Sequence, residues 1–559
     1  MESNRSCGVL LHPTSLPGGH GIGDFGEGAR RFVGYLQAAR QSRWQILPLG
    51  PVNGSGSPYQ ALSSFAGNPL MISLDDLVAA GLLAPEDLNG APGGNPAYCD
   101  FGAARAFKMP VLRRAFANFN ALVAAAAAAA AAKEEAAKEA APKPSRRKTG
   151  RQAAKDAKEV VAKAKEAPKE EAAKEVKAEA AAPAPEGPRA PYDDPAFQAF
   201  RKEQAHWLGD FALFMALRES FGEAAWWQWP EKGLVRREAK ALKEWREKLR
   251  DDVAFHEWLQ FVFYVQWGAL KKLANDAGIK IIGDIPIYPA HDSADVWSAP
   301  QFFAVDGETG AASVMAGCPP DYFSPDGQLW GNPVYRWDKL RADNYQWWRR
   351  RLETTLKLVD VLRLDHFRGF ESYWAVPAGE TTARNGKWEK GPGNDFFKAM
   401  KKALGDLPLI AEDLGVITPE VNALRDGNGF PGMKILQFAF CDGANFYRPH
   451  AYGRNCVVYT GTHDNDTTRG WYAAWGDDYA HMGRDVIDRE RDFARRYLAV
   501  DGNNIHWDMI RLAIASPADT AVYPMQDILG LGNDCRFNRP GVPTGNWTWR
   551  LTWEQLDHA

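Results

Sequence analysis

The sequence predicts an α/β protein, a (β/α)8 TIM barrel that carries large, mostly helical insertions between its strands. Eight short apolar runs recur along the chain, and most neighbouring runs are separated by a segment long enough for a crossover helix. Polar residues follow the later runs at their carboxyl ends, where the loops of such a barrel meet over one mouth. The eight runs are residues 7–12, 44–50, 280–288, 360–366, 407–415, 434–440, 456–464 and 520–527.

The first two runs are joined by a predicted helix over residues 28–40, which makes a βαβ beginning. Gly21-Ile-Gly-Asp-Phe-Gly lies in the connection and matches G-x-G-x-x-G. A dinucleotide site would also need an acidic residue at the end of the next strand, but that run reads Trp-Gln-Ile-Leu-Pro-Leu-Gly. We therefore interpret these glycines as a loop that lies against a ligand or the backbone.

The chain divides into five stretches by composition. Residues 1–50 hold the first barrel strands, and residues 276–559 hold the rest of the catalytic barrel with its inserted loops. Residues 51–121 and 192–275 are expected to form mostly helical insertions, whose Trp residues have loosely helical spacing. At least half of these Trp residues are expected to be helix-packing core. No C-terminal β-sandwich is expected, because the chain ends soon after the last strand.

Residues 122–191 differ from the rest, being built from Ala, Lys, Glu and Pro without aromatic residues, so they cannot bury an apolar face. Ala, Lys and Glu favour single helices and the prolines interrupt them, so we expect disorder or isolated helices. A nucleic-acid-binding arm is the alternative, but glutamates neutralise most of the lysines and leave one basic cluster, Arg146-Arg-Lys. The interpretation we favour is a solvated, functionally neutral insertion.

Composition argues against several classes of function. The net charge of −3 gives no global attraction to nucleic acid or acidic membranes. The six cysteines lack metal-ligand spacing and are expected to be free thiols in a reducing compartment. The N-terminus has no apolar signal region, and the alanine run around Ala124–Ala132 is expected to be too short to span a bilayer. These features predict a cytoplasmic protein without a membrane or nucleic-acid partner.

The stretch from Asp360 to Phe370, Asp-Val-Leu-Arg-Leu-Asp-His-Phe-Arg-Gly-Phe, is the most informative of the strand ends. Side chains alternate along a strand, so Arg363 and Asp365 point the same way, and the guanidinium favours the ionised carboxylate. An ionised carboxylate at a strand end suits a nucleophile or a charge stabiliser, and a structural Arg–Asp pair is the alternative. Further acids and histidines end other runs, which makes packing alone a poor explanation of the whole set.

Eight motifs make the chain resemble the 4-α-glucanotransferases of the amylomaltase type, glycoside hydrolase family 77. They run in order from end to end outside the Ala/Lys/Glu segment: Ser57-Pro-Tyr-Gln, Gly283-Asp-Ile-Pro-Ile-Tyr, Pro319-Pro-Asp-Tyr-Phe-Ser, Gln328-Leu-Trp-Gly-Asn-Pro, Arg363-Leu-Asp-His-Phe-Arg-Gly, Ala411-Glu-Asp-Leu-Gly, Gly461-Thr-His-Asp-Asn-Asp and Gly545-Asn-Trp-Thr-Trp-Arg-Leu. The long insertion, Pro289 and Cys318 depart from the family pattern, and none of them touches the acids.

The resemblance implies that Asp365 is the nucleophile, Glu412 the acid/base and Asp464 the transition-state stabiliser. It also implies sugar-site roles for Ser57, Tyr59, Asp284, Arg363, His366 and His463. Gln328 and the loop aromatics Tyr322, Phe323 and Trp330 are expected to complete the site, the aromatics by stacking on an acceptor sugar. Loop-anchoring core is the alternative for these aromatics.

The implied reaction moves a segment of a 1,4-α-glucan to the 4-hydroxyl of another glucan or of glucose. A retaining transfer needs two carboxyls roughly 5–5.5 Å apart, one to attack and one to protonate the departing oxygen. The charge of Asp365 is expected to raise the pKa of Glu412 so that it begins as the acid. No cofactor, metal or obligate protein partner is expected.

Three rival functions remain. An α-amylase-like hydrolase would use the same three acids but usually carries a C-terminal β-sandwich. A metal-dependent phosphohydrolase built on the His–Asp pairs would need more histidines with regular spacing. The third is a catalytically inactive glucan-binding or scaffold protein that uses the insertion as its arm.

Overall fold

The computed structural model describes residues 5–18, 20–54, 56–140, 194–320, 325–441, 445–474, 482–542 and 544–558. Its centre is an eight-stranded parallel sheet in which each strand pairs with the next strand of the barrel along the chain. The strands are β1 (Ser6–Leu10), β2 (Arg43–Gln45), β3 (Lys280–Ile285), β6 (Val361–Leu364), β9 (Leu409–Ala411), β10 (Gly432–Ile435), β11 (Cys456–Tyr459) and β12 (Thr520–Pro524).

The sheet closes into a barrel: the last strand pairs with the first, and β9 contacts β10. β12 pairs with β1 in parallel, and the Ala411 amide of β9 donates to the Pro431 carbonyl beside β10 over 2.9 Å. The predicted (β/α)8 barrel is therefore confirmed, and all eight predicted apolar runs supply its strands. Each strand is shorter than its run, and polar residues such as Asp365, Glu412 and Asp464 lie beyond the strands, in the loops of the mouth.

Helix α1 (Glu27–Ala38) connects β1 to β2 as predicted. Its buried residues Ala29, Phe32, Val33 and Leu36 recur at helical spacing, which gives the helix one apolar face against the barrel. The later connections carry α11 (Gln346–Leu358), α12 (Asn394–Leu404), α13 (Pro419–Gly427), α14 (Thr468–Ala473), α15 (Arg484–Leu498) and α16 (Ile505–Ala515). After β12 the described chain adds the short helices α17 (Met525–Ile528) and α18 (Trp553–His558).

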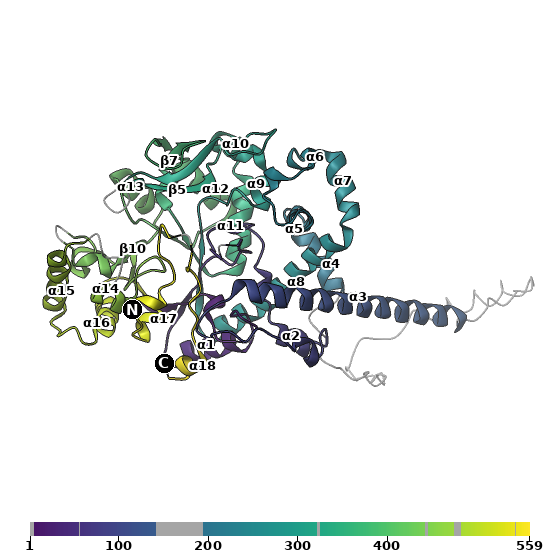
Figure 1. The fold of residues 1–559 in the computed structure, drawn as a ribbon, viewed down its shortest axis with the longest axis horizontal. Helices are drawn as coiled ribbons and strands as arrows, with labels where there is room; N and C mark the ends of the chain where they lie inside the picture. The colour runs from purple at the N-terminus through teal and green to yellow at the C-terminus, as the bar shows by residue number, and fades with distance from the viewer. Residues whose placement is uncertain are drawn as a thin grey trace, which may run out of the picture.

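Between β2 and β3 the chain builds a helical body beside the barrel (Figure 1). Its helices are α2 (Leu74–Ala79), α3 (Phe101–Ala140), α4 (Asp194–Glu203), α5 (Leu208–Ser220), α6 (Lys232–Val235), α7 (Ala239–Lys248) and α8 (Arg250–Asp276). Of the seven Trp residues in this region, five are at most 5 % exposed, namely Trp207, Trp226, Trp229, Trp258 and Trp267. The expectation that most of them form core is confirmed.

A second, four-stranded antiparallel sheet was not predicted. Its order is β5 (Gln328–Pro333), β4 (Val314–Cys318), β7 (Ser372–Pro377) and β8 (Lys387–Lys390), and two short helices, α9 (Ala294–Ser298) and α10 (Trp337–Ala342), belong to the same part of the chain. These strands come from the connections on both sides of β6, so no single stretch of sequence contains the whole sheet.

Helix α3 crosses the boundary that composition placed at residue 122. Its first half packs into the body through buried Lys108, Leu112 and Phe119, and its second half projects outward (Figure 1). The described part of the Ala/Lys/Glu segment, residues 122–140, is thus helical, and residues 141–193 lie outside the described residues.

By length and composition α3 meets the requirement for a membrane span, contrary to the expectation that its apolar run is too short. The stretch Phe101–Glu134 contains a window of mean hydropathy 1.6, of which 11 % is buried. One such helix is weak evidence for a membrane, because helices of water-soluble proteins pass the same test. The fully buried Lys108, paired with Asp24 at 3.2 Å, ties the start of this helix to the protein body.

Candidate active site

The polar residues at the barrel's strand ends converge on one mouth. Asp284 lies on β3 and Arg363 on β6, with Asp365 and His366 directly after β6. Glu412 follows β9, and the pair His463 and Asp464 follows β11. Because parallel barrel strands all end on the same side, chain segments 180 residues apart meet here.

Arg363 is the central cation of the site and lies between two carboxylates. Its Nη1 atom is 2.7 Å from an Asp284 oxygen, and its Nη2 atom is 2.9 Å from Asp365 Oδ1. The side chains of Arg363 and Asp284 are 3 % and 0 % exposed, whereas that of Asp365 is 29 % exposed. The expected contact between Arg363 and Asp365 is present, and the more exposed carboxylate is the one open to a ligand.

Asp284 is held in the interior by two donors, Arg363 and the Tyr59 hydroxyl, which donates to Asp284 over 2.8 Å. Burial raises the pKa of Asp284 to about 6 even though Arg363 opposes the shift. For Arg363, burial lowers the pKa, but the charges of Asp284 and Asp365 outweigh it and leave the pKa well above its ordinary value. The guanidinium therefore stays charged.

Glu412 is fixed by the backbone on both of its oxygens. The His366 amide donates to Oε2 over 2.7 Å, and the Leu414 amide donates to Oε1 over 2.8 Å. Burial and, next, the charge of Asp365 raise the pKa of Glu412 to about 7. The expected effect of Asp365 is present but ranks second to burial. Glu412 therefore keeps a proton that it can donate to a higher pH than an ordinary glutamate does.

Asp464 differs electrostatically from Glu412. Its Oδ2 atom lies 3.3 Å from His463 Nε2, and its Oδ1 atom accepts a hydrogen bond from Asn538 Nδ2 over 2.6 Å. Burial would raise the pKa of Asp464, but the His463 charge and these two donors outweigh it and hold the pKa well below the ordinary range. For His463, burial lowers the pKa and the nearby Asp464 carboxylate more than reverses this, so the pKa is raised.

Aromatic rings border the acids on two sides. The Tyr59 and His463 rings stack with centroids 5.1 Å apart, and Trp547 lies 5.8 Å and 5.9 Å from them. On the other side, Trp330 of β5 meets the His366 ring edge-on at 4.8 Å. Burial, followed by the charge of Arg368, lowers the pKa of His366 to about 3, so this imidazole is neutral.

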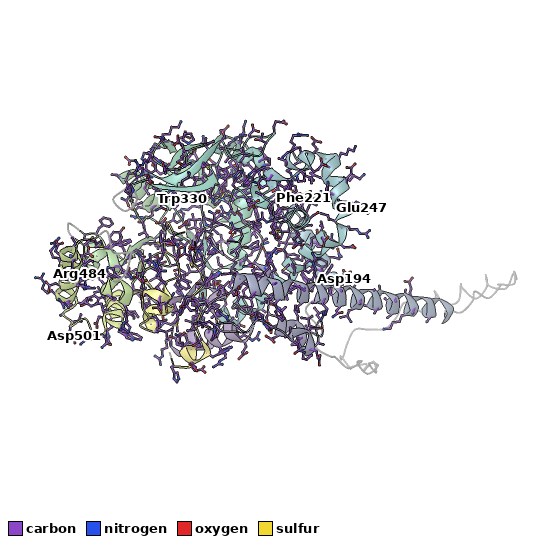
Figure 2. The ribbon with its side chains drawn as sticks, viewed as in Figure 1. Asp194, Phe221, Glu247, Trp330, Arg484 and Asp501 are labelled. Atoms are coloured by element: carbon purple, nitrogen blue, oxygen red, sulfur yellow. The ribbon has the colours of Figure 1, made fainter. Side chains whose placement is uncertain are left out.

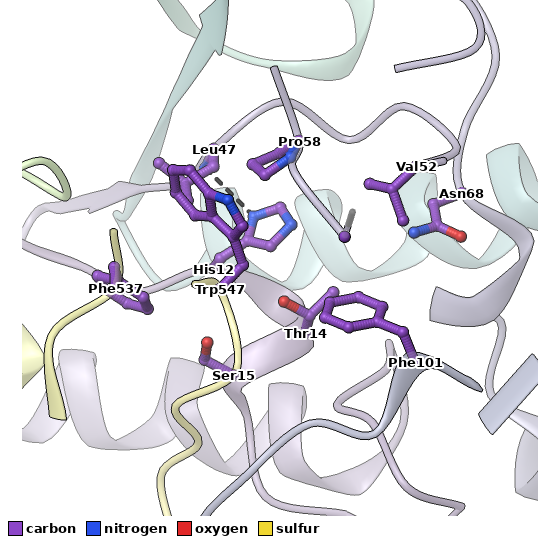
Figure 3. Close-up of a pocket in the computed structure, with 11 residues that line it drawn as sticks. His12, Thr14, Ser15, Leu47, Val52, Pro58, Asn68, Phe101, Phe537 and Trp547 are labelled. Atoms are coloured by element: carbon purple, nitrogen blue, oxygen red, sulfur yellow. Dashed lines mark hydrogen bonds between the residues drawn. The ribbon is translucent and has the colours of Figure 1, made fainter. Parts of the chain in front are cut away.

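A small pocket continues inward from Trp547 (Figure 3). Trp547 and Phe537 border it from the C-terminal segment, and His12 borders it from the loop after β1. The Leu47 amide donates to His12 Nδ1 over 3.2 Å, and burial, together with the charge of His463, lowers the pKa of His12 to about 3. The His12 imidazole is therefore neutral.

The remaining predicted residues fall near this mouth or outside the described residues. The Ser57 hydroxyl accepts a hydrogen bond from the Tyr59 amide over 3.3 Å, which shapes the turn that presents Tyr59. Gln328 Oε1 accepts from Trp330 Nε1 over 3.1 Å on β5. Tyr322 and Phe323 lie outside the described residues.

Sequence reasoning missed Asn538 and Trp547. Trp547 lies in the quoted motif Gly545-Asn-Trp-Thr-Trp, but nothing local indicates that it turns toward Tyr59. Asn538 lies in an irregular segment without a periodic pattern. Among the described residues, no group of three or more His, Cys, Asp or Glu side chains is arranged to hold a metal ion.

Comparison with known proteins gives a consistent result over the whole chain. A family model described as 4-alpha-glucanotransferase, glycoside hydrolase 77, matches residues 11–141 and 138–556. The chain is 45 % identical to a 4-alpha-glucanotransferase of Synechocystis sp., with 100 % of this chain and 96 % of the relative covered. It is 44 % identical to a 4-alpha-glucanotransferase of Thermus thermophilus, with coverages of 99 % and 95 %.

A solved structure shares the fold over the same length. It is the amylomaltase from Streptococcus agalactiae in complex with acarbose, which superposes with a TM-score of 0.82 at 36 % identity. The superposition covers 99 % of this chain and 96 % of that protein.

Proposed function

Since the chain belongs to the 4-alpha-glucanotransferase family, glycoside hydrolase family 77, we propose that it transfers segments of 1,4-α-glucans between acceptors by a retaining double displacement. The donor is a maltooligosaccharide or a longer 1,4-α-glucan, and the acceptor is the 4-hydroxyl of a second glucan or of glucose. The bound acarbose of the Streptococcus agalactiae relative supports this substrate class.

One observation supports the mechanism most strongly: the acids of the mouth are in different electrostatic states. Asp365 is paired with a permanent cation, whereas the half-buried Glu412 has a pKa of about 7. A carboxyl with a raised pKa beside a carboxylate held by a cation suits a proton donor next to a nucleophile.

In the first half-reaction Asp365 attacks the anomeric carbon while Glu412 gives its proton to the departing glycosidic oxygen. The bond from carbon one to that oxygen breaks, and a bond to an Asp365 oxygen forms. In the second half-reaction the ionised Glu412 takes the proton from the acceptor 4-hydroxyl, whose oxygen displaces Asp365. Both protons and both bonds balance, and the enzyme returns to its starting state.

Asp464 stabilises the flattened, positively charged sugar ring between these steps. Its lowered pKa supports this role, because an anion is needed there throughout the cycle. The sugar-binding roles of Ser57, Tyr59, Asp284, Gln328, Trp330, Arg363, His366 and His463 belong to the same proposal. The stacked Tyr59 and His463 rings offer a wall for the sugar at the reaction centre.

A cytoplasmic location is part of the proposal and is supported by the cysteines. All six lie among the described residues as free thiols, as expected in a reducing compartment.

Incubation with pure maltotriose tests the proposal against hydrolysis. Transfer produces a ladder of longer oligosaccharides together with glucose, while the number of reducing ends stays constant. Reducing ends that rise without a ladder would establish an amylase-like hydrolase. Asp365→Asn is expected to abolish turnover while glucan binding persists, which also separates an enzyme from a scaffold protein.

A further inference from the structure

The segment that contains Asn538 lies beside the loop after β11, although it follows the last barrel strand in the sequence. We call residues 533–542 the strap; it follows α17 and passes beside the loop after β11. The backbone N–H of Asn538 donates to the His463 carbonyl over 3.2 Å. The Arg536 guanidinium donates to the Asp464 carbonyl over 2.8 Å. The strap thus holds the backbone of both residues of the His463–Asp464 pair.

The strap also holds the side chain of Asp464. The side-chain Nδ2 atom of Asn538 donates to Asp464 Oδ1 over 2.6 Å, while His463 Nε2 faces Asp464 Oδ2. An ionised carboxylate only accepts hydrogen bonds, so the NH2 group of Asn538 must face it. With one donor on each oxygen, the carboxylate plane cannot rotate, although the Asp464 side chain is 46 % exposed.

Asn538 is itself held in place. Arg536 Nε donates to the Asn538 carbonyl over 2.6 Å, and Asn533 Nδ2 donates to Asp466 over 2.7 Å. Arg539 Nη2 donates in turn to Asn533 Oδ1 over 2.5 Å. The strap is therefore tied at several points to the same loop that carries Asp464, which makes its amide a preorganised donor.

We propose that Asn538 is a positioning residue for the transfer reaction. Its uncharged side-chain amide donates a hydrogen bond that fixes the plane of the Asp464 carboxylate. The inference rests on the role of Asp464 in the proposed function. A neutral amide suits this place because it orients the anion without neutralising it, which a second cation beside His463 would tend to do.

Two substitutions test this role. Asn538→Ala removes the donor, and the kcat for maltotriose is expected to fall by roughly 10- to 100-fold, the loss that accompanies a misplaced reacting group, with little change in KM. Asn538→Asp keeps the shape but places two carboxylates within hydrogen-bond distance. They share a proton at low pH and repel each other when both are ionised. The activity of this variant relative to wild type is therefore expected to be several-fold lower at pH 8 than at pH 5.5.

Asn503→Asp is the matched control. Asn503 Nδ2 donates to the exposed Asp501 over 2.8 Å, so the substitution creates the same carboxylate pair away from the mouth. Figure 2 shows Asp501 at the edge of the molecule, well apart from Trp330. This control is expected to follow the wild-type pH profile throughout.

A purely structural role for Asn538 would lower the melting temperature and the fraction of active protein but leave the pH profile of the remaining activity unchanged. That result, or a kcat for Asn538→Ala within twofold of wild type, would overturn the inference. Wild-type protein that forms no maltotriose ladder would instead refute the proposed function, so the two failures are distinguishable.

Discussion

At the scale of single residues, the site separates two carboxyl groups of similar chemistry by their surroundings. Glu412 is half-buried and accepts hydrogen bonds from two backbone amides, and burial, followed by the Asp365 charge, raises its pKa. Asp464 is also half-buried, but it faces a histidine and an amide, which lower its pKa. Burial raises the pKa of both groups, so the difference follows from the neighbouring charges and hydrogen bonds: the Asp365 charge beside Glu412, and His463 with Asn538 beside Asp464.

The pKa of Glu412 predicts the pH dependence of the first half-reaction. Because Glu412 must be protonated to act as the acid, kcat/KM for maltotriose is expected to fall as the pH rises through about 7. A glycosyl fluoride donor, whose fluoride leaves without a proton, is the control. Its kcat/KM should lack this fall, and an identical fall with both donors would contradict the assignment of Glu412.

Removing the Asp365 charge should lower the pKa of Glu412. In Asp365→Asn the repulsion disappears, while the opposing effect of Arg363 and the backbone hydrogen bonds remain. Titration of 13C-labelled glutamate carboxyls by NMR measures this without any need for activity. The Glu412 pKa is expected to be lower in the variant than in wild type, and an unchanged value would show that the two carboxyls are not coupled.

At the scale of elements, the loops and insertions differ in how much they contribute to the fold. The first half of α3 is part of the core, whereas from Ala124 onward its described side chains are exposed. Exposed segments without packed apolar side chains contribute little to folding and tolerate change.

Deletion of residues 124–185 is accordingly expected to leave maltotriose turnover nearly unchanged. Lys108→Met, in the packed half of α3, is the contrasting variant, because it leaves Asp24 without its buried cation. Such a loss costs about 3–5 kcal/mol of unfolding free energy, measurable by urea denaturation. A large loss of turnover in the deletion variant would mean that residues 124–185 support the folded enzyme.

At the scale of the whole molecule, the site joins parts of the chain that have no local connection. Asp284, Arg363, Glu412 and Asp464 come from four different barrel strands or the loops after them, and Asn538 comes from the strap. A ligand that contacts all of them therefore stabilises the closed barrel as a unit.

Acarbose is expected to bind this mouth and to stabilise the whole protein. At 100 times its Kd, the unfolding free energy should rise by about 2.7 kcal/mol, as linkage requires for a ligand that binds only the folded state. Denaturation curves with and without acarbose measure the increase. His463→Ala should reduce this increase in unfolding free energy, whereas Asn503→Asp should not. An increase of equal size in the wild type and both variants would mean that acarbose binds outside the mouth.

The sequence by itself determined the barrel and the place of its acids. Apolar runs and helical periods are local patterns, and the end of a parallel strand has only one side of the barrel to occupy, so Asp365, Glu412 and Asp464 could be assigned to one mouth. Only the tertiary structure decided the antiparallel sheet around β6, the burial that dominates the pKa of Glu412, and the contact of Asn538 with Asp464. Each of these depends on which distant segments come together and how completely they exclude water, and neither quantity is encoded in a local stretch of residues.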